Sequence, residues 1–305
     1  MIIKLQQCLK VLLLHLFNMD LKTKKHLIRH CLSDALQNDI GQDSRVIDAS
    51  RYMSLNGSSG LYRPLLLLST AECYSVPIQR ALPIAVAIEL AHVASLIADD
   101  IMDNSDKRRG SLSCHKKYGR DIASLSHMYL REVVQEMIDE KNDFSDKQKR
   151  DITRRALHAG KKMIYGQEKD VLQRDLDTPE KIIEMYEQKT GSLIGSALSC
   201  GGIIGDSCHD DINRLNYIGI AMGVSYQIID DALDERASSS ETGKPSNQDL
   251  KKQTLVKMVG WDKIKMLKSE KDALVDDLMG KINGDTSGLR GLVMQLRHKR
   301  DKYLV

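Results

Sequence analysis

The stretch Ser95-Leu96-Ile97-Ala98-Asp99-Asp100-Ile101-Met102-Asp103 can be laid without gaps over Tyr226-Gln227-Ile228-Ile229-Asp230-Asp231-Ala232-Leu233-Asp234. Both stretches run from mainly apolar residues into the pattern Asp-Asp-x-x-Asp. They begin 131 residues apart, which is far longer than the period of a solenoid repeat. This internal similarity predicts two related halves of one helical bundle.

The rest of the chain also favours helices. Apolar residues recur at helical spacing, and alternating apolar-polar runs are nearly absent. We expect helices over residues 64–75, 80–103, 149–174, 179–204 and 210–235, and an amphipathic tail over 261–305. Polar segments over 104–113 and 236–249 directly follow the two aspartate clusters and are expected to be loops. The sequence therefore predicts an all-α fold.

Composition excludes several classes of function. The 45 basic and 42 acidic side chains give a net charge of +3, and no basic stripe carries interleaved aromatics, so nucleic acid is not an expected partner. The six cysteines form no CxxC pair and no zinc-ligand cluster, which favours free thiols in a reducing cytoplasm. The apolar run 11–17 is too short to span a bilayer, and we expect no other segment to reach membrane-spanning length, so stable membrane insertion is not expected.

The first 18 residues stand apart from the rest. No small-x-small cleavage site follows their apolar run, and a polar helical stretch opens at Met19. We expect residues 1–18 to be an added segment or a result of start-site choice. Residues 19–305 are expected to form one domain.

The aspartate clusters predict a cation site. On a helix, Asp99 shares a face with Asp103, and Asp230 shares a face with Asp234, at a spacing where like charges destabilise the helix by about 0.2–0.5 kcal/mol. The helix dipole also disfavours anions at a C-terminal end.

An all-oxygen ligand set indicates magnesium, manganese or calcium, and there is no EF-hand loop. Magnesium completes its shell with phosphate oxygens, so we expect a phosphate or diphosphate substrate. The pair Asp276-Asp277 has no third aspartate and is interpreted as surface.

Basic residues follow both clusters. Arg108 and Arg109 come soon after the first cluster, and arginine forks suit phosphate oxygens. Lys244 follows the second cluster, in Gly243-Lys244-Pro245. Lys189 stands where its helix becomes apolar, so it must reach solvent or meet an anion.

This ordered set of motifs resembles the trans-isoprenyl diphosphate synthases, or polyprenyl synthetases, over roughly residues 50–255. The resemblance rests on the two clusters and, in chain order, on Glu89-Leu90-x-His92, Arg108-Arg109-Gly110, Gly166-Gln167-x-x-Asp170, Lys189-Thr190-Gly191, Gln227 and Gly243-Lys244-Pro245. It implies a single-domain orthogonal helical bundle of the isoprenoid synthase type around a deep apolar cavity, usually a homodimer. It also implies isopentenyl diphosphate and an allylic diphosphate as substrates.

The same resemblance implies roles for individual residues. About three Mg²⁺ ions would bridge the allylic diphosphate to the principal ligands Asp99, Asp103 and Asp230. Asp100, Asp231 and Asp234 would be ligands or lie behind them. Positions that hold the allylic diphosphate are matched by Arg108, Lys189, Thr190, Gln227 and Lys244, and positions that hold isopentenyl diphosphate by Arg63, His92 and Arg109.

The expected metal ions, basic residues and apolar cavity fit a reaction that begins with ionisation of the allylic diphosphate. Metal ions and basic groups would stabilise the diphosphate that leaves as an allylic cation forms, and an apolar cavity would keep water from the cation. Ala94 and Ser95, five and four residues before Asp99, are small and leave room for a growing chain. We expect a product at least as long as farnesyl diphosphate, and geranylgeranyl diphosphate or longer in particular.

One segment departs from the family pattern. Where the family has Gly-Gly-Lys-Arg-x-Arg-Pro, residues 58–64 read Ser-Ser-Gly-Leu-Tyr-Arg-Pro. Gly60 replaces the lysine that would bind isopentenyl diphosphate and Leu61 replaces the next basic residue, so at least one cation is missing from the site of the second substrate. The loss keeps three alternatives open. The chain is an elongating prenyltransferase with a weakened or rebuilt second site, a terpene synthase-like lyase that ionises one allylic diphosphate, or a non-catalytic subunit of a prenyl synthase.

Overall fold

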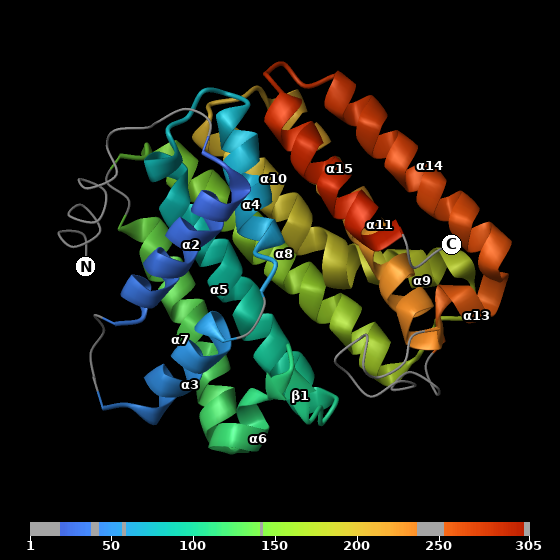
Figure 1. Ribbon diagram of the computed structural model, residues 1–305, viewed down its shortest axis with the longest axis horizontal. Coiled ribbons are helices and arrows are strands. Elements are labelled where there is room, and N and C mark those ends of the chain that lie inside the picture. The colour runs from blue at the N-terminus through green and yellow to red at the C-terminus, as the bar shows by residue number, and fades with distance from the viewer. Residues whose placement is uncertain (1–18, 38–42, 57–58, 141–142, 237–252, 302–305) are drawn as a thin grey trace.

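The computed structural model describes residues 19–37, 43–56, 59–140, 143–236 and 253–301 (Figure 1). The proposed extra segment 1–18 and the residue Lys244 lie outside the described residues, as does the side chain of Asp234. What the sequence predicts for them stays a prediction.

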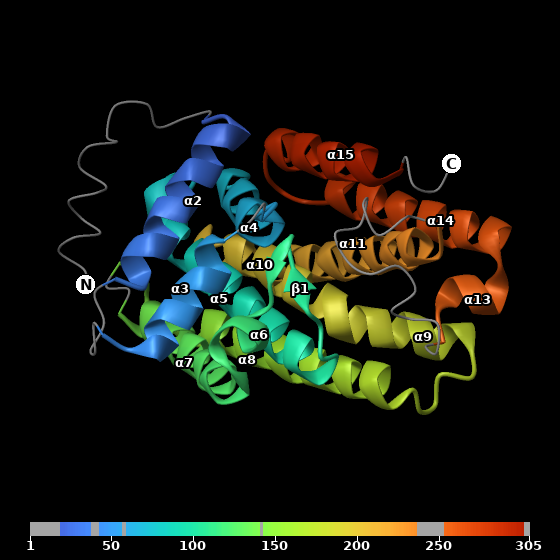
Figure 2. The same cartoon turned by 60° about the horizontal axis from the view of Figure 1, so that its bottom comes forward.

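The described chain is helical except for one small hairpin, which confirms the all-α fold (Figures 1 and 2). In chain order the elements are α2 (Leu21–Ala35), α3 (Arg45–Leu55), α4 (Tyr62–Glu72), α5 (Ile78–Met102), β1 (Lys107–Arg108), β2 (Ser111–Leu112), α6 (Cys114–Tyr118), α7 (Arg120–Asp139), α8 (Asp146–Leu172), α9 (Pro179–Tyr186), the π-helical turn η1 (Glu187–Gly191), α10 (Ser192–Ile204), α11 (His209–Arg236), α13 (Leu255–Val259), α14 (Trp261–Gly280) and α15 (Ser287–Asp301).

Two apolar helices form the centre of the bundle. Every residue of α10 is buried, and α10 packs against α4, α8 and α11. The longer α5 packs mainly against α7 and α4. Because both helices are apolar on nearly all sides, they can be stable only inside the protein. Both aspartate clusters lie at the carboxyl ends of long helices, α5 and α11, which pass through this core.

The helix α5 corrects one expectation from the sequence. It is long and apolar enough to cross a membrane by length and composition, although no segment was expected to reach that length. In the protein, 72% of its most apolar window is buried. A core helix passes the same test as a membrane span, and the packing of α5 accounts for its composition.

Two other segments differ in detail from the prediction. The helix expected over 179–204 is present with those bounds, but its middle is the π-helical turn η1. The expected loop after the first cluster contains the hairpin β1–β2, which pairs Lys107 with Leu112 and Arg108 with Ser111. Arg109 and Gly110 form its turn with φ of 54° and 82°. Gly110 takes such a conformation easily, whereas Arg109 is strained there.

The surface interpretation of Asp276 and Asp277 is confirmed, because both are exposed on α14.

Small residues let α10 and α11 approach at backbone distance. A Cβ added at Gly219 of α11 would lie 2.4 Å from the backbone nitrogen of Gly195 in α10. A Cβ at Gly223 would lie 2.3 Å from Cα of Gly191 in η1. No other residue type fits this contact without a shift of the helices. The close approach places η1 beside the turn of α11 that carries Gln227 and the second cluster.

Candidate active site

A cavity of about 590 Å³ opens beside the carboxyl ends of α5 and α11. Both aspartate clusters reach it, Asp99 and Asp103 from α5, and Asp230 and Asp231 from α11. The elements that line it include α4, the β1–β2 hairpin, α7, α8 and η1. Residues that are about 130 positions apart in the chain therefore face one space, as the sequence comparison of the two halves predicts.

In the first cluster, the two adjacent aspartates differ in exposure. Asp100 is fully buried, and its Oδ1 accepts hydrogen bonds from Arg108 Nε, at 2.9 Å, and from Arg108 Nη2. Asp99 lies at the cavity wall and accepts from Arg108 Nη2 at 3.0 Å and from Gln167 Nε2 at 2.8 Å. Burial alone would lower the pKa of Arg108, but the hydrogen bonds and charges of Asp100 and Asp99 raise it. Arg108 thus anchors the hairpin to the end of α5.

Asp103 is placed differently from Asp99. It follows the last residue of α5, is exposed, and lines the cavity. Its backbone nitrogen donates to the carbonyl of Asp99 at 2.9 Å, so the helical geometry persists through the third aspartate. Asp99 and Asp103 therefore stand on the same side of the helix end, as their spacing predicts.

Lys189 meets carboxylates in the cavity wall. Its Nζ donates to Asp170 Oδ2 at 2.7 Å and lies 3.6 Å from Asp99 Oδ1. Gly166 on α8 makes this possible, because a Cβ there would lie 2.3 Å from the backbone nitrogen of Lys189. The π-helical turn adds a residue to the helical repeat, a feature frequent at functional sites. Of the two outcomes expected for Lys189, solvent or an anion, the lysine thus meets an anion, the carboxylate of Asp170.

The second cluster repeats the division into a buried and an exposed carboxylate. Asp231 is buried and accepts from the hydroxyl of Tyr186 and from Gln227 Nε2, the latter at 3.2 Å. Thr190 in turn donates to Gln227 Oε1 at 3.0 Å. Burial, followed by the charge of Asp231, raises the pKa of Tyr186. Two of the residues expected to hold the allylic diphosphate, Thr190 and Gln227, are therefore linked to each other and to Asp231.

Asp230 is the exposed member of the second cluster. Its side chain is 43% exposed, and its Oδ1 pairs with Arg300 Nη2 from α15. The Arg300 guanidinium lies over the ring of Tyr226, with its carbon 3.3 Å from the ring centroid. Helix α15, from the far end of the chain, thus contacts a residue of the cavity wall.

A second group of basic side chains lies along the cavity, beside and on α4. Arg63, His92 and Arg109 all line it, around the buried carboxyl of Glu89. Glu89 Oε1 accepts from Ser59 Oγ at 3.0 Å and lies 3.6 Å from Arg109 Nη2. Burial raises the pKa of Glu89, against the charges of Arg109 and Arg63.

Two arginine nitrogens in this group have no hydrogen-bond acceptor in the part of the chain described. They are Nε of Arg63 and Nη1 of Arg109, both buried. A buried donor without an acceptor costs about 1–3 kcal/mol. Burial, then the charges of Arg63, Arg109 and Arg108, lower the pKa of His92 well below its usual value, so its imidazole is neutral near pH 7. An anion entering here would supply acceptors to both arginines.

The departure at position 60 has a structural counterpart. A Cβ at Gly60 would lie 2.4 Å from the Tyr62 ring, so that ring covers the place where a side chain at position 60 would begin. Leu61 is buried with φ of 53°. A lysine at position 60 would require Tyr62 to move.

Of the two residues expected to set chain length, Ser95 lines the cavity and Ala94 does not. Ser95 lines the cavity, and its hydroxyl donates to the carbonyl of His92 in the same helix at 2.7 Å. Ala94 is buried, and its carbonyl accepts from Nδ1 of His127 on α7 at 2.8 Å. His127 also lines the cavity, together with Met163 on α8. No pattern in the sequence singled out His127.

The carboxylates can accommodate a divalent ion only in a particular way. Within the described ranges, no group of three or more His, Cys, Asp or Glu residues is close enough together to hold a metal ion by itself. The cavity instead offers one or two carboxylates from each side, all oxygen donors. This arrangement fits Mg²⁺, which typically uses one or two carboxylates and takes its remaining ligands from water and phosphate. Water molecules and a bound diphosphate would then complete the shell of the metal.

Several contacts were not predicted from the sequence. Gln167 and Asp170 belong to a motif that was noticed but given no role, and both line the cavity. No pattern in the sequence indicated the contacts of Tyr186 and Arg300, because their partners lie 45 and 70 residues away in the chain. Each gains its partner through helix packing.

Comparison with known proteins was made on sequence and structure. Residues 45–292 match the family described as Polyprenyl synthetase. The chain is 32% identical over 262 residues to geranylgeranyl pyrophosphate synthase 4 of Arabidopsis thaliana, across 82% of this chain and 70% of that protein. It is 31% identical over 258 residues to the heterodimeric geranylgeranyl pyrophosphate synthase large subunit 2 of the same plant, across 82% of this chain and 68% of the relative. The crystal structure of a geranyltranstransferase from Thermotoga maritima matches with a TM-score of 0.74 and 28% identity, across 92% of this chain and 98% of that one.

Proposed function

Because this chain belongs to the polyprenyl synthetase family and is a prenyltransferase of chain elongation, we propose that it holds an allylic diphosphate between its two aspartate clusters and extends it with isopentenyl diphosphate. The observation that carries this proposal is the cavity that Asp99 and Asp103 share with Asp230 and Asp231. Asp99, Asp103 and Asp230 are the proposed Mg²⁺ ligands, and three ions would match the family resemblance.

The residues around the clusters supply orientation and charge. Bound Mg²⁺ would neutralise the charge that develops on the departing diphosphate. Arg108 fixes Asp99, and the buried Asp100 and Asp231 hold the ends of their helices in place. Lys189 and Thr190 reach the cavity from η1, where a diphosphate oxygen could replace one of their present partners. Lys244 is proposed to join them from a segment outside the described residues.

The second substrate is assigned to the group around Glu89. Arg63 and Arg109 each present a buried donor without an acceptor among the described residues, and the neutral His92 lies beside them. A diphosphate there would turn two costly donors into charge-assisted hydrogen bonds. Since Gly60 contributes no cation, this site is proposed to rely on two arginines and a histidine. That composition predicts a raised KM for isopentenyl diphosphate rather than a lost reaction.

The product is proposed to be geranylgeranyl diphosphate or longer. Ser95 is small and lines the cavity, and Ala94 adds no bulk behind it. The Arabidopsis relative is named for geranylgeranyl pyrophosphate, which agrees with this length. The Thermotoga neighbour is named geranyltranstransferase, so the family includes other activities at similar identity.

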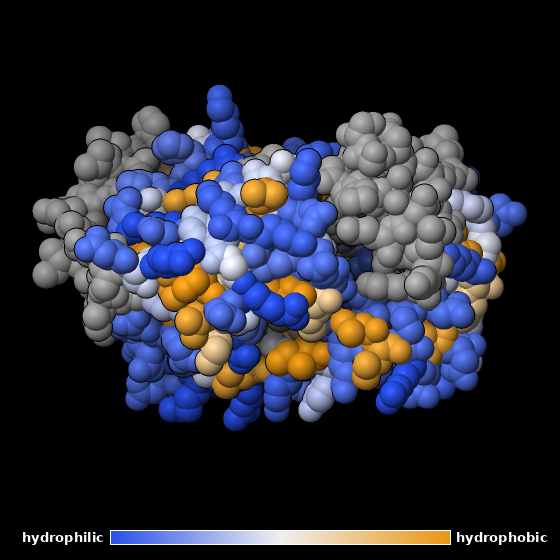
Figure 3. All heavy atoms as spheres, turned by 90° about the horizontal axis from the view of Figure 1, so that it is seen from below, coloured by the Kyte–Doolittle hydropathy of each residue, from blue (hydrophilic) through white to orange (hydrophobic). Residues whose placement is uncertain are grey.

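The assembly is proposed to be a homodimer through α7 and α8. Large apolar side chains remain exposed on both helices, namely Leu125, Met128, Leu157, Ile164 and Tyr165. Apolar atoms also form a band on the face of the molecule in Figure 3. Such a surface favours a protein partner, and a second copy brings an identical patch. A relative named as a heterodimeric large subunit makes a different partner the alternative. The described cysteines form no disulfide with one another, and a cytoplasmic location is proposed on that ground.

One incubation separates the three functions left open by the sequence. Purified protein with Mg²⁺ receives farnesyl diphosphate, with and without isopentenyl diphosphate, and the products are separated by chromatography. We expect longer diphosphates that require isopentenyl diphosphate. A hydrocarbon or alcohol formed from farnesyl diphosphate alone would identify a lyase instead. Absence of turnover together with assembly onto another synthase would identify a non-catalytic subunit.

A further inference from the structure

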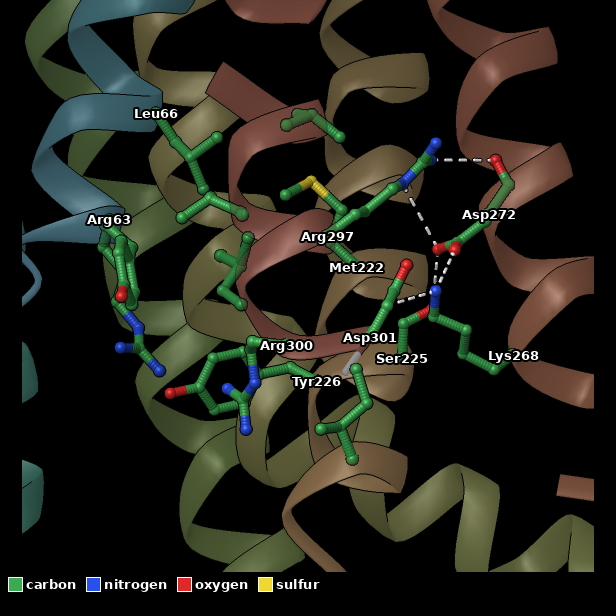
Figure 4. Close-up of a pocket in the computed structure, with 15 residues that line it drawn as sticks. Arg63, Leu66, Met222, Ser225, Tyr226, Lys268, Asp272, Arg297, Arg300 and Asp301 are labelled. Carbon is green, nitrogen blue, oxygen red and sulfur yellow. Dashed lines mark hydrogen bonds and ion pairs between the residues drawn. The ribbon is translucent and has the colours of Figure 1, made fainter. Parts of the chain in front are cut away.

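The last turn of α15 places a cation on the second aspartate cluster. Arg300 pairs with Oδ1 of Asp230, and its side chain is only 13% exposed. Figure 4 shows the guanidinium lying against the ring of Tyr226, one helical turn before Asp230 on α11. The aromatic face and the carboxylate together fix the position of the guanidinium, since arginine stacks on rings while it pairs with anions.

Helix α15 is also held on the bundle by ion pairs with α14. Arg297 Nη1 lies 2.9 Å from Asp276 Oδ2. Lys268 Nζ lies 2.6 Å from Asp301 Oδ1 (Figure 4). Arg297 Nη2 also donates to the carbonyl of Asp272 at 2.9 Å. The contact of Arg300 with Asp230 is therefore separable from the contacts that anchor the helix.

A small cavity of about 70 Å³ lies beside Arg300. Apolar side chains of α4, α10, α11 and α15 line much of it, including Leu66, Met222 and Leu296 (Figure 4). Arg300 and Tyr226 border this cavity, and Tyr226 and Asp230 border the large one. Arg300 thus stands at the boundary between the metal-facing carboxylate and a space that is not filled by side chains.

We propose that Arg300 is a positioning residue that holds Asp230 until a divalent cation replaces it, so that the last turn of α15 is a latch released by metal and diphosphate. The inference rests on the proposed role of Asp230 as a metal ligand. A guanidinium and a divalent ion compete for one carboxylate, because both need its negative charge. By linkage, each weakens the binding of the other.

The test compares binding of Mn²⁺ alone, measured by EPR spectroscopy of the free ion, in the full chain and in Arg300→Gln. Removal of the positive charge that pairs with Asp230 should lower the Kd for Mn²⁺ on the order of fivefold. Arg300→Lys keeps a charge without the planar fork, so its Kd should fall between those of the other two. Arg290→Gln is the matched control on the same helix, because Arg290 Nε donates to the nearby Thr286 Oγ1 at 3.0 Å, and its Kd should equal that of the unchanged protein.

Hydrogen exchange provides the second readout. Mn²⁺ with inorganic diphosphate should speed exchange of the amides in the last turn of α15 in the unchanged protein. In Arg300→Gln that turn should exchange quickly from the start and respond little. An equal or higher Kd in Arg300→Gln, or an unchanged exchange rate on loading, would overturn the latch. If the unchanged protein neither binds Mn²⁺ nor turns over substrate, the proposed function fails instead.

Discussion

Lys189 donates from Nζ to Asp170 Oδ2 across 2.7 Å, and this pair joins the π-helical turn η1 to α8 at the wall of the cavity. Asp99 Oδ1 lies 3.6 Å from the same nitrogen. The lysine therefore links the first aspartate cluster to the turn that leads to the second. A diphosphate bound between the clusters would meet a cation that the protein has already placed.

Replacement of Lys189 by glutamine should reduce kcat/KM for the allylic substrate on the order of 10²-fold, because a charge-assisted contact with the diphosphate is lost. The fold should lose about 1–3 kcal/mol, since Asp170 and Asp99 lose a buried partner. Steady-state kinetics and urea unfolding measure the two effects. Lys181→Gln is the control, because Lys181 pairs with Asp177 on the exposed side of α9 and should change neither. Unchanged kinetics in Lys189→Gln would remove this residue from the site.

Asp99→Asn should lower kcat on the order of 10²- to 10³-fold while the protein stays folded, because a neutral amide binds a divalent ion poorly. Rates of product formation and circular dichroism provide the comparison. Asp277→Asn, on exposed α14 and paired with Lys281, should retain full activity. Chelation of divalent ions by EDTA should stop turnover, and added Mg²⁺ should restore it. Activity that survives EDTA would contradict the metal assignment.

Ser95→Phe should shorten the product. Ser95 lines the cavity four residues before Asp99, so a phenyl ring would fill the path of the growing chain. The product analysed by chromatography should shift toward farnesyl diphosphate or shorter, with turnover retained. Ser95→Ala, which changes the polarity and leaves the space, should keep the original length. The same product from both variants would show that the chain grows along another wall.

At acidic pH, the free energy of unfolding should depend on His92. Burial and three neighbouring arginines lower the pKa of His92 in the folded protein. Below about pH 6.5 the unfolded chain takes up a proton that the folded protein does not, so the free energy of unfolding falls as pH falls. One such proton contributes at most about 1.4 kcal/mol per pH unit.

His92→Gln should make this slope shallower, and the two proteins should show parallel profiles above about pH 7.5. Urea unfolding across the pH range measures both. The pKa of Glu89 is raised by burial, so Glu89 also affects how stability depends on pH, and the difference between the two proteins is the quantity to compare. Identical slopes would mean that His92 titrates alike in the folded and unfolded chains.

Gly219→Ala should destabilise the protein by about 1–3 kcal/mol, because a Cβ there would lie 2.4 Å from the backbone nitrogen of Gly195. The separation of α10 from α11 should also disturb the neighbouring Thr190–Gln227 contact and raise KM for the allylic substrate. Thermal unfolding and kinetics report the two effects. Gly291→Ala on α15, where nothing lies within 4 Å, should stabilise the helix by about 0.5–1 kcal/mol.

Local patterns in the sequence were sufficient to predict the fold class and to locate the two aspartate clusters. Helical spacing of apolar residues predicted the helix over 179–204 with its observed bounds, and it predicted α5, α8 and α11 to within a few residues. The carboxylate motifs could be recognised because an i, i+4 pair shares a helix face whatever the rest of the chain does. The hairpin β1–β2 was missed, since two-residue strands leave no period to detect.

The sequence by itself determined that helices carry two sets of aspartates to their carboxyl ends, because periodicity and motif spacing act over a few residues. Only the tertiary structure decided which side chains meet there: Lys189 with Asp170, Tyr186 with Asp231, and Arg300 with Asp230. These pairs depend on how closely α8, η1, α11 and α15 pack. That packing follows from contacts such as Gly195 against Gly219, between residues that are distant in the chain and show no local pattern.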